Sequence, residues 1–128
     1  MPRVEQVIKH NFAVIASKAE FLKLTDKEME YLIDQKINAR EIDIFNAYVK
    51  WADHQLLKKD LEVTDANRRQ VMTGIELIRF PNMSMDEFVN PYCLSNILTA
   101  EEKLEIMLYI NYPEDNLYRT KFSTSRRY

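Results

Sequence analysis

The stretch AREIDIFNAYVKWADHQLLK, residues 39–58, carries apolar side chains on more than one side of a helix. One stripe, with members three or four residues apart, consists of Ile42, Phe45, Val49, Ala52 and Leu56. A second stripe consists of Ile44, Tyr48 and Trp51. A surface helix usually has a single apolar stripe, whereas a helix that is apolar on several sides is buried among neighbours. The sequence therefore predicts that residues 39–58 form the central helix of a bundle.

Helix-start patterns recur on both sides of this segment. Thr25–Glu28, Ser84–Glu87 and Thr99–Glu102 each have the capping-box spacing, in which a hydroxyl and a glutamate three residues later satisfy each other's backbone amides. Asn38 is expected to cap the central helix with its side chain. Because a periodic apolar run follows each cap, the pattern predicts an all-α fold, an antiparallel helix-pair bundle of about six helices.

A fourth helix is expected to begin at Thr64 or Asp65 and to end before Pro81, which cannot continue a helix. This assignment places Gly74, the single glycine, inside the helix. Glycine in a helix interior costs about 1 kcal/mol relative to alanine. We therefore expect a neighbouring element to approach Gly74 closely.

The composition is that of one soluble globular domain. The chain has 128 residues, of which 46% are hydrophobic and 30% charged, and its net charge of −2 provides no overall positive field for nucleic acid. No apolar run is long enough to span a membrane, and the N-terminal residues lack the apolar region of a signal peptide. The expected compartment is therefore the cytoplasm or the nucleus, and membrane and nucleic-acid partners are not expected.

The last twelve residues differ from the rest. Residues 117–128 contain four cations (Arg119, Lys121, Arg126 and Arg127) and no acid, and their apolar residues alternate as in a strand. We expect a helical domain over residues 1–116 and, over residues 117–128, a basic non-helical tail or the lead-in to a following domain, outside the bundle core. An RNA-binding arm is the alternative interpretation of the same cations.

Residue types that could carry chemistry are few and widely separated. His10, His54 and Cys93 do not have metal-ligand spacing, so we expect no metal, no cofactor and no catalytic residue. Cys93, between Tyr92 and Leu94, is expected to be a buried apolar residue. An enzyme that uses Cys93 or His54 remains an alternative.

Residues 12–52 resemble the BACK domain, a helical domain that follows BTB domains. The residues that carry the likeness in this segment are Phe12, Ile15, Phe21, Leu22, Leu24, Glu41, Phe45, Ala47 and Trp51. Residues 66–90 and 95–109 are similar to BTB-domain-containing relatives of this family rather than to its Kelch relatives. There the matching residues are Ile78, Arg79, Phe80, Pro81, Met83, Ser84, Glu87, Phe88, Ser95, Ile97, Leu98, Thr99, Glu102 and Lys103.

The resemblance implies a non-catalytic scaffold in a substrate adaptor of a cullin-3 RING ubiquitin ligase. In such adaptors an upstream BTB domain dimerises and binds the cullin, and a C-terminal domain, often of the PHR type, recognises the substrate. The sequence before Phe12 does not contain the BTB domain or the full opening helix pair, so we expect little direct cullin binding by these residues alone.

Within such a scaffold, core packing is expected for Phe21, Phe45 and Trp51. Glu41 and Arg79 are interpreted either as an inter-helix ion pair or as surface residues. A generic helical interaction module, unrelated to ubiquitin, is the competing function.

Overall fold

The computed structural model describes residues 12–112 and 120–124, and these residues are helical or irregular, with no strand among them. The elements in chain order are α2 (Phe12–Ala16), α3 (Ala19–Leu22), α4 (Asp26–Ile33), α5 (Glu41–Lys58), α6 (Asp65–Val71), the 3₁₀ helices η1 (Ile75–Leu77) and η2 (Phe80–Asn82), α7 (Met85–Phe88) and α8 (Ala100–Asn111). The all-α prediction is confirmed, although several helices are shorter and more numerous than expected. None of the described helices has the length and hydropathy required to cross a bilayer.

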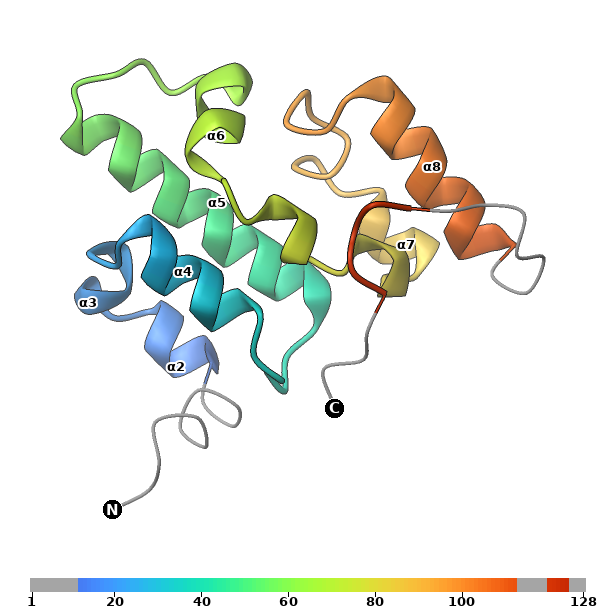
Figure 1. Ribbon diagram of the computed structural model, residues 1–128, viewed down its shortest axis with the longest axis horizontal. Helices are drawn as coiled ribbons and strands as arrows, with labels where there is room; N and C mark the ends of the chain where they lie inside the picture. The colour runs from blue at the N-terminus through green and yellow to red at the C-terminus, as the bar shows by residue number, and fades with distance from the viewer. Residues whose placement is uncertain (1–11, 113–119, 125–128) are drawn as a thin grey trace.

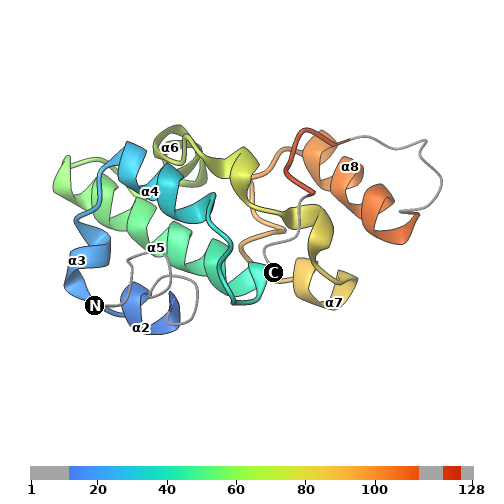
Figure 2. The ribbon, with the colours of Figure 1, turned by 60° about the horizontal axis from the view of Figure 1, so that its bottom comes forward.

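The helices form two groups in an elongated molecule (Figure 1). In the first group α4 and α5 run antiparallel, with α2 and α3 on one side of α5 and α6 on the other (Figure 2). The second group consists of α7, α8 and the loop over residues 90–98. The 3₁₀ helix η2 lies between the groups, because it contacts both α5 and α8.

The longest element, α5, is the central helix that its two apolar stripes predict. Both stripes are buried, and Ile44, Phe45, Val49 and Trp51 have no exposed surface. The Trp51 indole Nε1–H also donates to the Leu24 carbonyl at 2.9 Å. Burial therefore fixes α5 on several sides, and a directed hydrogen bond ties it to the chain that enters α4.

Three of the four caps named above are present, and Thr64, at the expected start of the fourth helix, also caps α6, because its hydroxyl accepts the Asn67 N–H at 3.1 Å. Thr25–Glu28, Ser84–Glu87 and Thr99–Glu102 form complete capping boxes at the starts of α4, α7 and α8. The prediction for Asn38 is wrong, because α5 begins after Arg40, which makes no side-chain cap. The Arg40 guanidinium instead pairs with Asp43 in the first turn, at 3.0 Å.

The assignment of Gly74 to a helix interior is also wrong. α6 ends at Val71, and Gly74 instead precedes η1. The expected close approach does exist there: a Cβ at Gly74 would lie 2.8 Å from the Glu30 Cγ. The Gly74 N–H donates to the buried Tyr48 hydroxyl at 3.0 Å, and burial raises the pKa of Tyr48. Pro81 lies inside η2 and does not terminate α6.

The prediction that the tail lies outside the bundle core is wrong for Phe122. The Phe122 side chain is 2% exposed and belongs to the hydrophobic core. The tail contains no acid, but α8 supplies two: Glu102 pairs with the Lys121 ammonium, and Glu105 accepts the Lys121 backbone N–H. The described part of the tail is non-helical, as expected, and the domain boundary at residue 116 stays a prediction.

The C-terminus of α5 is closed by a Schellman motif. The Leu61 N–H donates to the Leu56 carbonyl at 2.8 Å, and the Asp60 N–H donates to the Leu57 carbonyl at 3.1 Å. The motif needs a left-handed residue, and Asp60 adopts a φ of 59°. Aspartate tolerates this conformation less well than glycine, so the cap retains local strain.

Replacing Trp51 with alanine should severely destabilise the protein. The change empties a fully buried site and removes the partner of the Leu24 carbonyl. Large-to-alanine changes in cores cost about 3–5 kcal/mol. Denaturant titration measures the loss, with Leu57→Ala as the control because Leu57 lies on the same helix and is 67% exposed. A loss below about 1 kcal/mol for Trp51→Ala would contradict the central role of α5.

Replacing Asp60 with glycine should stabilise the protein, because glycine adopts the left-handed conformation without a steric penalty. The expected gain is about 0.5–1 kcal/mol in the free energy of unfolding, after the entropy that glycine adds to the unfolded chain. Lys59→Gly is the matched control, since Lys59 has a φ of −91° and should lose stability on the same change. A less stable Asp60→Gly variant would show that the Asp60 side chain compensates for the strain.

Candidate functional site

The apolar residues singled out in the sequence lie in the shared core. Twelve of them are buried and three, Ile15, Leu22 and Leu24, are partly buried. The buried ones are Phe12, Phe21, Phe45, Ala47, Trp51, Ile78, Phe80, Pro81, Met83, Phe88, Ile97 and Leu98. These side chains pack in the interior of the bundle or at its edge, and their place in a family motif stays a prediction.

Glu41 and Arg79, the predicted charged pair, are both buried and in contact. They are 9% and 5% exposed, so the surface alternative does not describe them. The Arg79 backbone N–H donates to the Glu41 carboxylate at 2.8 Å, and the Arg79 guanidinium lies 3.4 Å from the Asp34 carbonyl. Glu41 therefore connects the first turn of α5 to the residue that precedes η2.

Cys93, the candidate nucleophile, is fully buried. Its Sγ lies 3.0 Å from the Asn90 amide nitrogen, and burial raises the pKa of the thiol to about 12. Because the thiolate is the reactive form, this environment does not favour nucleophilic chemistry. His54 is half-buried on α5 and His10 lies outside the described residues. Within 12–112 and 120–124, no three His, Cys, Asp or Glu side chains are placed to hold a metal ion.

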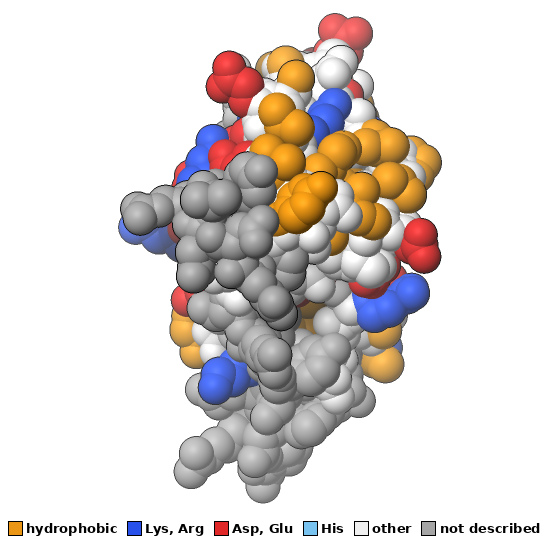
Figure 3. Space-filling model, turned by 90° about the vertical axis from the view of Figure 1, so that its right-hand side faces the viewer, with side chains coloured by type: hydrophobic (Ala, Val, Ile, Leu, Met, Phe, Trp, Pro, Cys, Tyr) orange, Lys and Arg blue, Asp and Glu red, His pale blue; other side chains and the backbone are white. Residues whose placement is uncertain are grey.

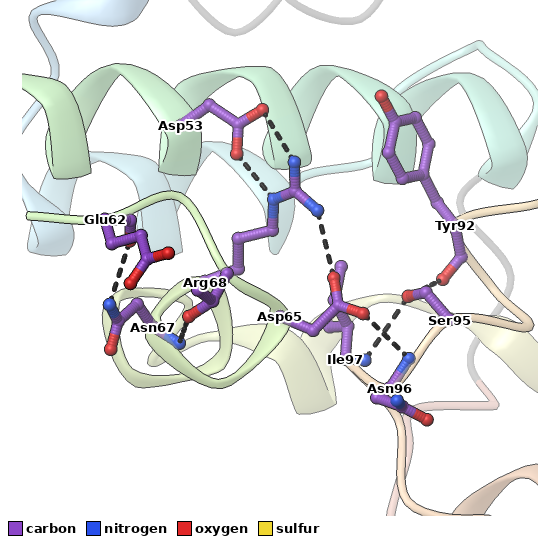
Figure 4. A network of polar contacts seen from close by, with 10 residues as sticks. Asp53, Glu62, Asp65, Asn67, Arg68, Tyr92, Ser95, Asn96 and Ile97 are labelled. Atoms are coloured by element: carbon purple, nitrogen blue, oxygen red, sulfur yellow. Dashed lines mark hydrogen bonds and ion pairs between the residues drawn. The ribbon is translucent and has the colours of Figure 1, made fainter.

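A first polar network joins α5, α6 and the loop over residues 90–98 (Figure 4). The Arg68 guanidinium binds both Asp53 oxygens, at 2.6 and 3.2 Å, and donates to Asp65 at 2.9 Å. The other Asp65 oxygen accepts the Asn96 backbone N–H at 3.1 Å. The guanidinium also lies 5.9 Å from the centre of the Tyr92 ring, within the range of a cation–π interaction.

A second network centres on the Glu102 carboxylate at the start of α8, which is 4% exposed. Arg69 donates to both carboxylate oxygens, at 2.7 and 2.8 Å, and also to the Ile97 carbonyl at 2.8 Å. The Thr99 backbone N–H at 2.8 Å and the Lys121 ammonium at 2.6 Å complete the set of donors. These charge-assisted bonds, above all those from Arg69, hold the pKa of Glu102 well below its ordinary value.

We call these two networks together the polar junction, comprising Asp53, Asp65, Arg68, Arg69, Tyr92, Asn96 and Glu102. The sequence analysis missed most of it. The available signal was the adjacent pair Arg68–Arg69 on a short helix, whose two side chains reach different partners. Glu102 was interpreted only as a capping residue. The arrangement has the chemistry of a structural clamp between the two helix groups.

A hydrophobic area is exposed on the face of the molecule at the α8 end (Figure 3). On α8 and just beyond it, Leu104 and Tyr112 are 58% and 52% exposed, and in the preceding segment Val89 and Leu94 are 50% and 42% exposed. Exposed apolar areas of this kind are typical of surfaces that contact other proteins.

The described residues thus form helical and irregular structure with a buried clamp, a buried thiol and exposed apolar side chains. The sequence profile of the family "BACK: BTB And C-terminal Kelch" matches residues 1–93, most of the chain. The chain therefore belongs to the BACK family. The match ends before α8, so α8 and the Lys121 contact lie beyond the region that the profile covers.

Relatives with similar sequences extend the likeness through α8. Human BTB/POZ domain-containing protein 6 is 30% identical over 118 residues, which make up 90% of this chain and 22% of that protein. Human BTB/POZ domain-containing protein 3 is 33% identical over 100 residues, 76% of this chain and 19% of that protein. The chain thus spans about a fifth of the length of these relatives. No solved structure is significantly similar to it.

Replacing Glu102 with glutamine should weaken the protein in a pH-dependent way. The pKa of Glu102 is lower in the folded state than its ordinary value of 4.5. The carboxylate therefore stabilises the fold at pH values above 4.5, and this contribution is lost as the pH falls below 4.5. We expect Glu102→Gln to cost about 2 kcal/mol near neutral pH, the scale of hydrogen bonds to a charged group. The deficit should shrink toward about pH 3.

Denaturant titrations at several pH values measure this difference. Glu101→Gln, on the same helix but exposed, is the matched control and should show little change at any pH. A deficit for Glu102→Gln that stays constant as the pH falls would show that the network does not depend on the charge of Glu102.

Proposed function

We propose that the chain is a linker and scaffold in a substrate adaptor of a cullin-3 RING ubiquitin ligase. In this role it holds an upstream BTB domain and a C-terminal substrate-recognition domain in a defined relative position. The observation that carries the proposal is the polar junction, which joins the two helix groups through charge-assisted hydrogen bonds. Membership in the BACK family and relatives named for their BTB/POZ domains support the same role.

A positioning role requires a domain that does not bend between its ends. The two helix groups share a continuous core through η2, where Phe80 packs on Phe45 of α5 at 4.9 Å and on Phe88 of α7 at 6.4 Å between ring centroids. The polar junction adds directional contacts beside this core. Bidentate arginine–carboxylate pairs, such as Arg69–Glu102, also fix the orientation of their partners.

The proposal places the protein in the cytoplasm, with protein partners and without nucleic acid, membrane or cofactor. Lys121, a cation of the alternative RNA-binding arm, pairs with Glu102, and the Phe122 side chain is buried and so is not presented to a nucleic acid. The buried free Cys93 is suited to a reducing compartment.

A generic helical interaction module is the second candidate function. The observation that favours it is the hydrophobic area at the α8 end (Figure 3), together with the exposed side chains of Val89, Leu94, Leu104 and Tyr112, which are available to a partner without any BTB domain. This alternative predicts that the chain binds a partner by itself.

Cullin binding separates the two functions. We expect residues 1–128 alone to bind a cullin-3 N-terminal region with a Kd weaker than about 100 μM, because a stable interface buries about 1,200–2,000 Å² and most of it would come from the BTB side. The second protein is a hybrid in which this chain replaces the matching segment of human BTB/POZ domain-containing protein 6. This hybrid should bind the cullin-3 region tightly. Calorimetric titration of both proteins against the same cullin fragment makes the comparison.

Two results would contradict the proposal in different ways. Micromolar binding by residues 1–128 alone would place the cullin contact within this chain. No binding by the folded hybrid, when the unaltered human protein binds, would remove the ubiquitin-ligase role and favour the generic interaction module.

A further inference from the structure

Residues 120–124, which we call the latch, lie against the bundle without forming a helix or a strand. We propose that η1, η2 and the first half of α8 form a recognition surface for a short peptide with a Lys-Phe-Ser/Thr sequence, and that the chain's own latch occupies it. The surface, which we call the latch seat, consists of Glu76, Phe80, Asn82, Glu102 and Glu105. Each member of the seat contacts the latch through a contact of a different kind.

The polar contacts hold one side chain and several backbone groups of the latch. The Lys121 ammonium pairs with Glu102 at 2.6 Å, and the Lys121 backbone N–H donates to the Glu105 carboxylate at 2.8 Å. Two residues further on, the Ser123 N–H donates to the Glu76 carbonyl at 2.9 Å. The contact with Glu102 selects a cation at position 121. The two backbone contacts hold the chain on both sides of residue 122.

That residue, Phe122, supplies the apolar anchor. Its ring meets the Phe80 ring edge to face, at 5.1 Å and 82°, and its side chain is 2% exposed. The Lys121 ammonium lies 5.7 Å from the centre of the Phe122 ring, so the cation and the anchor also support each other. A central aromatic anchor beside an oriented charge is the arrangement of short-peptide recognition sites.

The latch is held more loosely than a core helix, because it has no regular secondary structure and Lys121 is 46% exposed at its side chain. The sequence connects it to α8 through residues 113–119. A short connection of this kind gives an effective concentration in the millimolar range. If the separate peptide binds with a Kd of about 100 μM, the same sequence within the chain would be docked about ten times as often as it is released.

Docking has a consequence for any domain that follows, and this step rests on the proposed function. With the latch docked, the chain continues from Thr124 beside η2, where the Thr124 carbonyl accepts from the Asn82 amide at 3.3 Å. With the latch released, the chain continues from the end of α8. A competing peptide of the same chemistry would therefore change the point from which a following domain extends.

A labelled peptide with the sequence of residues 117–124, LYRTKFST, tests the latch without any cullin. The full chain carrying Phe122→Ala has an unoccupied anchor position, and we expect it to bind the peptide with a Kd of about 100 μM or tighter in a fluorescence polarisation titration. The unaltered chain should bind at least about tenfold more weakly, because its own latch competes. Tyr112→Ala, a change in an exposed aromatic outside the seat, should behave like the unaltered chain.

A peptide with alanine in place of the phenylalanine should bind neither protein. Equal binding to the unaltered and Phe122→Ala chains, or no binding to a folded Phe122→Ala chain, would overturn the proposal. A dimer of the unaltered chain that disappears with Phe122→Ala would also overturn it, because the occupant would then be a second copy. Since no cullin is present, none of these results depends on the ubiquitin-ligase role.

A second measurement covers the case in which Phe122→Ala does not fold. Lys121→Glu places a like charge beside Glu102 and Glu105, and we expect it to reduce the hydrogen-exchange protection of the Ser123 amide at least about tenfold. Lys58→Glu makes the same charge change at the far end of α5 and should leave that amide unchanged. Unchanged Ser123 protection in Lys121→Glu would contradict recognition of the cation by the seat.

Discussion

The burial of α5 on several sides is the constraint on which the rest of the structure depends. Its apolar stripes need partners on each side, and α3, α6 and η2 all pack against it. Two long-range hydrogen bonds then fix its orientation: Trp51 donates to the Leu24 carbonyl, and the Gln55 amide donates to the Leu22 carbonyl at 2.8 Å. Because both acceptors lie at the end of α3 and just beyond it, α5 positions the chain that enters α4.

The polar junction extends this order to the second helix group. Buried charges are costly to desolvate, and they stabilise a fold only when their hydrogen bonds are complete. Glu102 meets this condition with donors from α6, from its own cap at Thr99 and from the latch. One carboxylate thus links three segments that are distant in the sequence. Removing any of its donors would leave the buried charge of Glu102 less well compensated.

Local patterns in the sequence predicted the local structure well. The three capping boxes depend on residues three positions apart, and the stripes of α5 depend on one helical period, so both could be recognised without a fold. The predictions failed where distant residues decide the outcome. Gly74 packs against Glu30, and Phe122 packs against Phe80. In both pairs the two residues are far apart in the sequence.

The polar junction was not predicted from the sequence, where the residues singled out were mostly apolar residues of the core. Arg69 and Glu102 are 33 positions apart, and each has an adequate local explanation, as a helix-surface cation and as a cap. Nothing in their spacing indicates that they meet. The resemblance to BACK domains predicted the class of protein correctly, and the profile match and the BTB/POZ relatives confirm it.

The central claim is that both helix groups behave as one rigid unit, and native-state hydrogen exchange tests it most directly. The measurement compares the free energies of opening for amides in the middle of α5 and of α8 at increasing denaturant concentrations. If the groups unfold together, the two values should agree within about 0.5 kcal/mol and fall with the same slope. Opening of α8 at a free energy several kcal/mol below that of α5 would mean that the second group unfolds independently, which would contradict the coupling of the two groups by the polar junction.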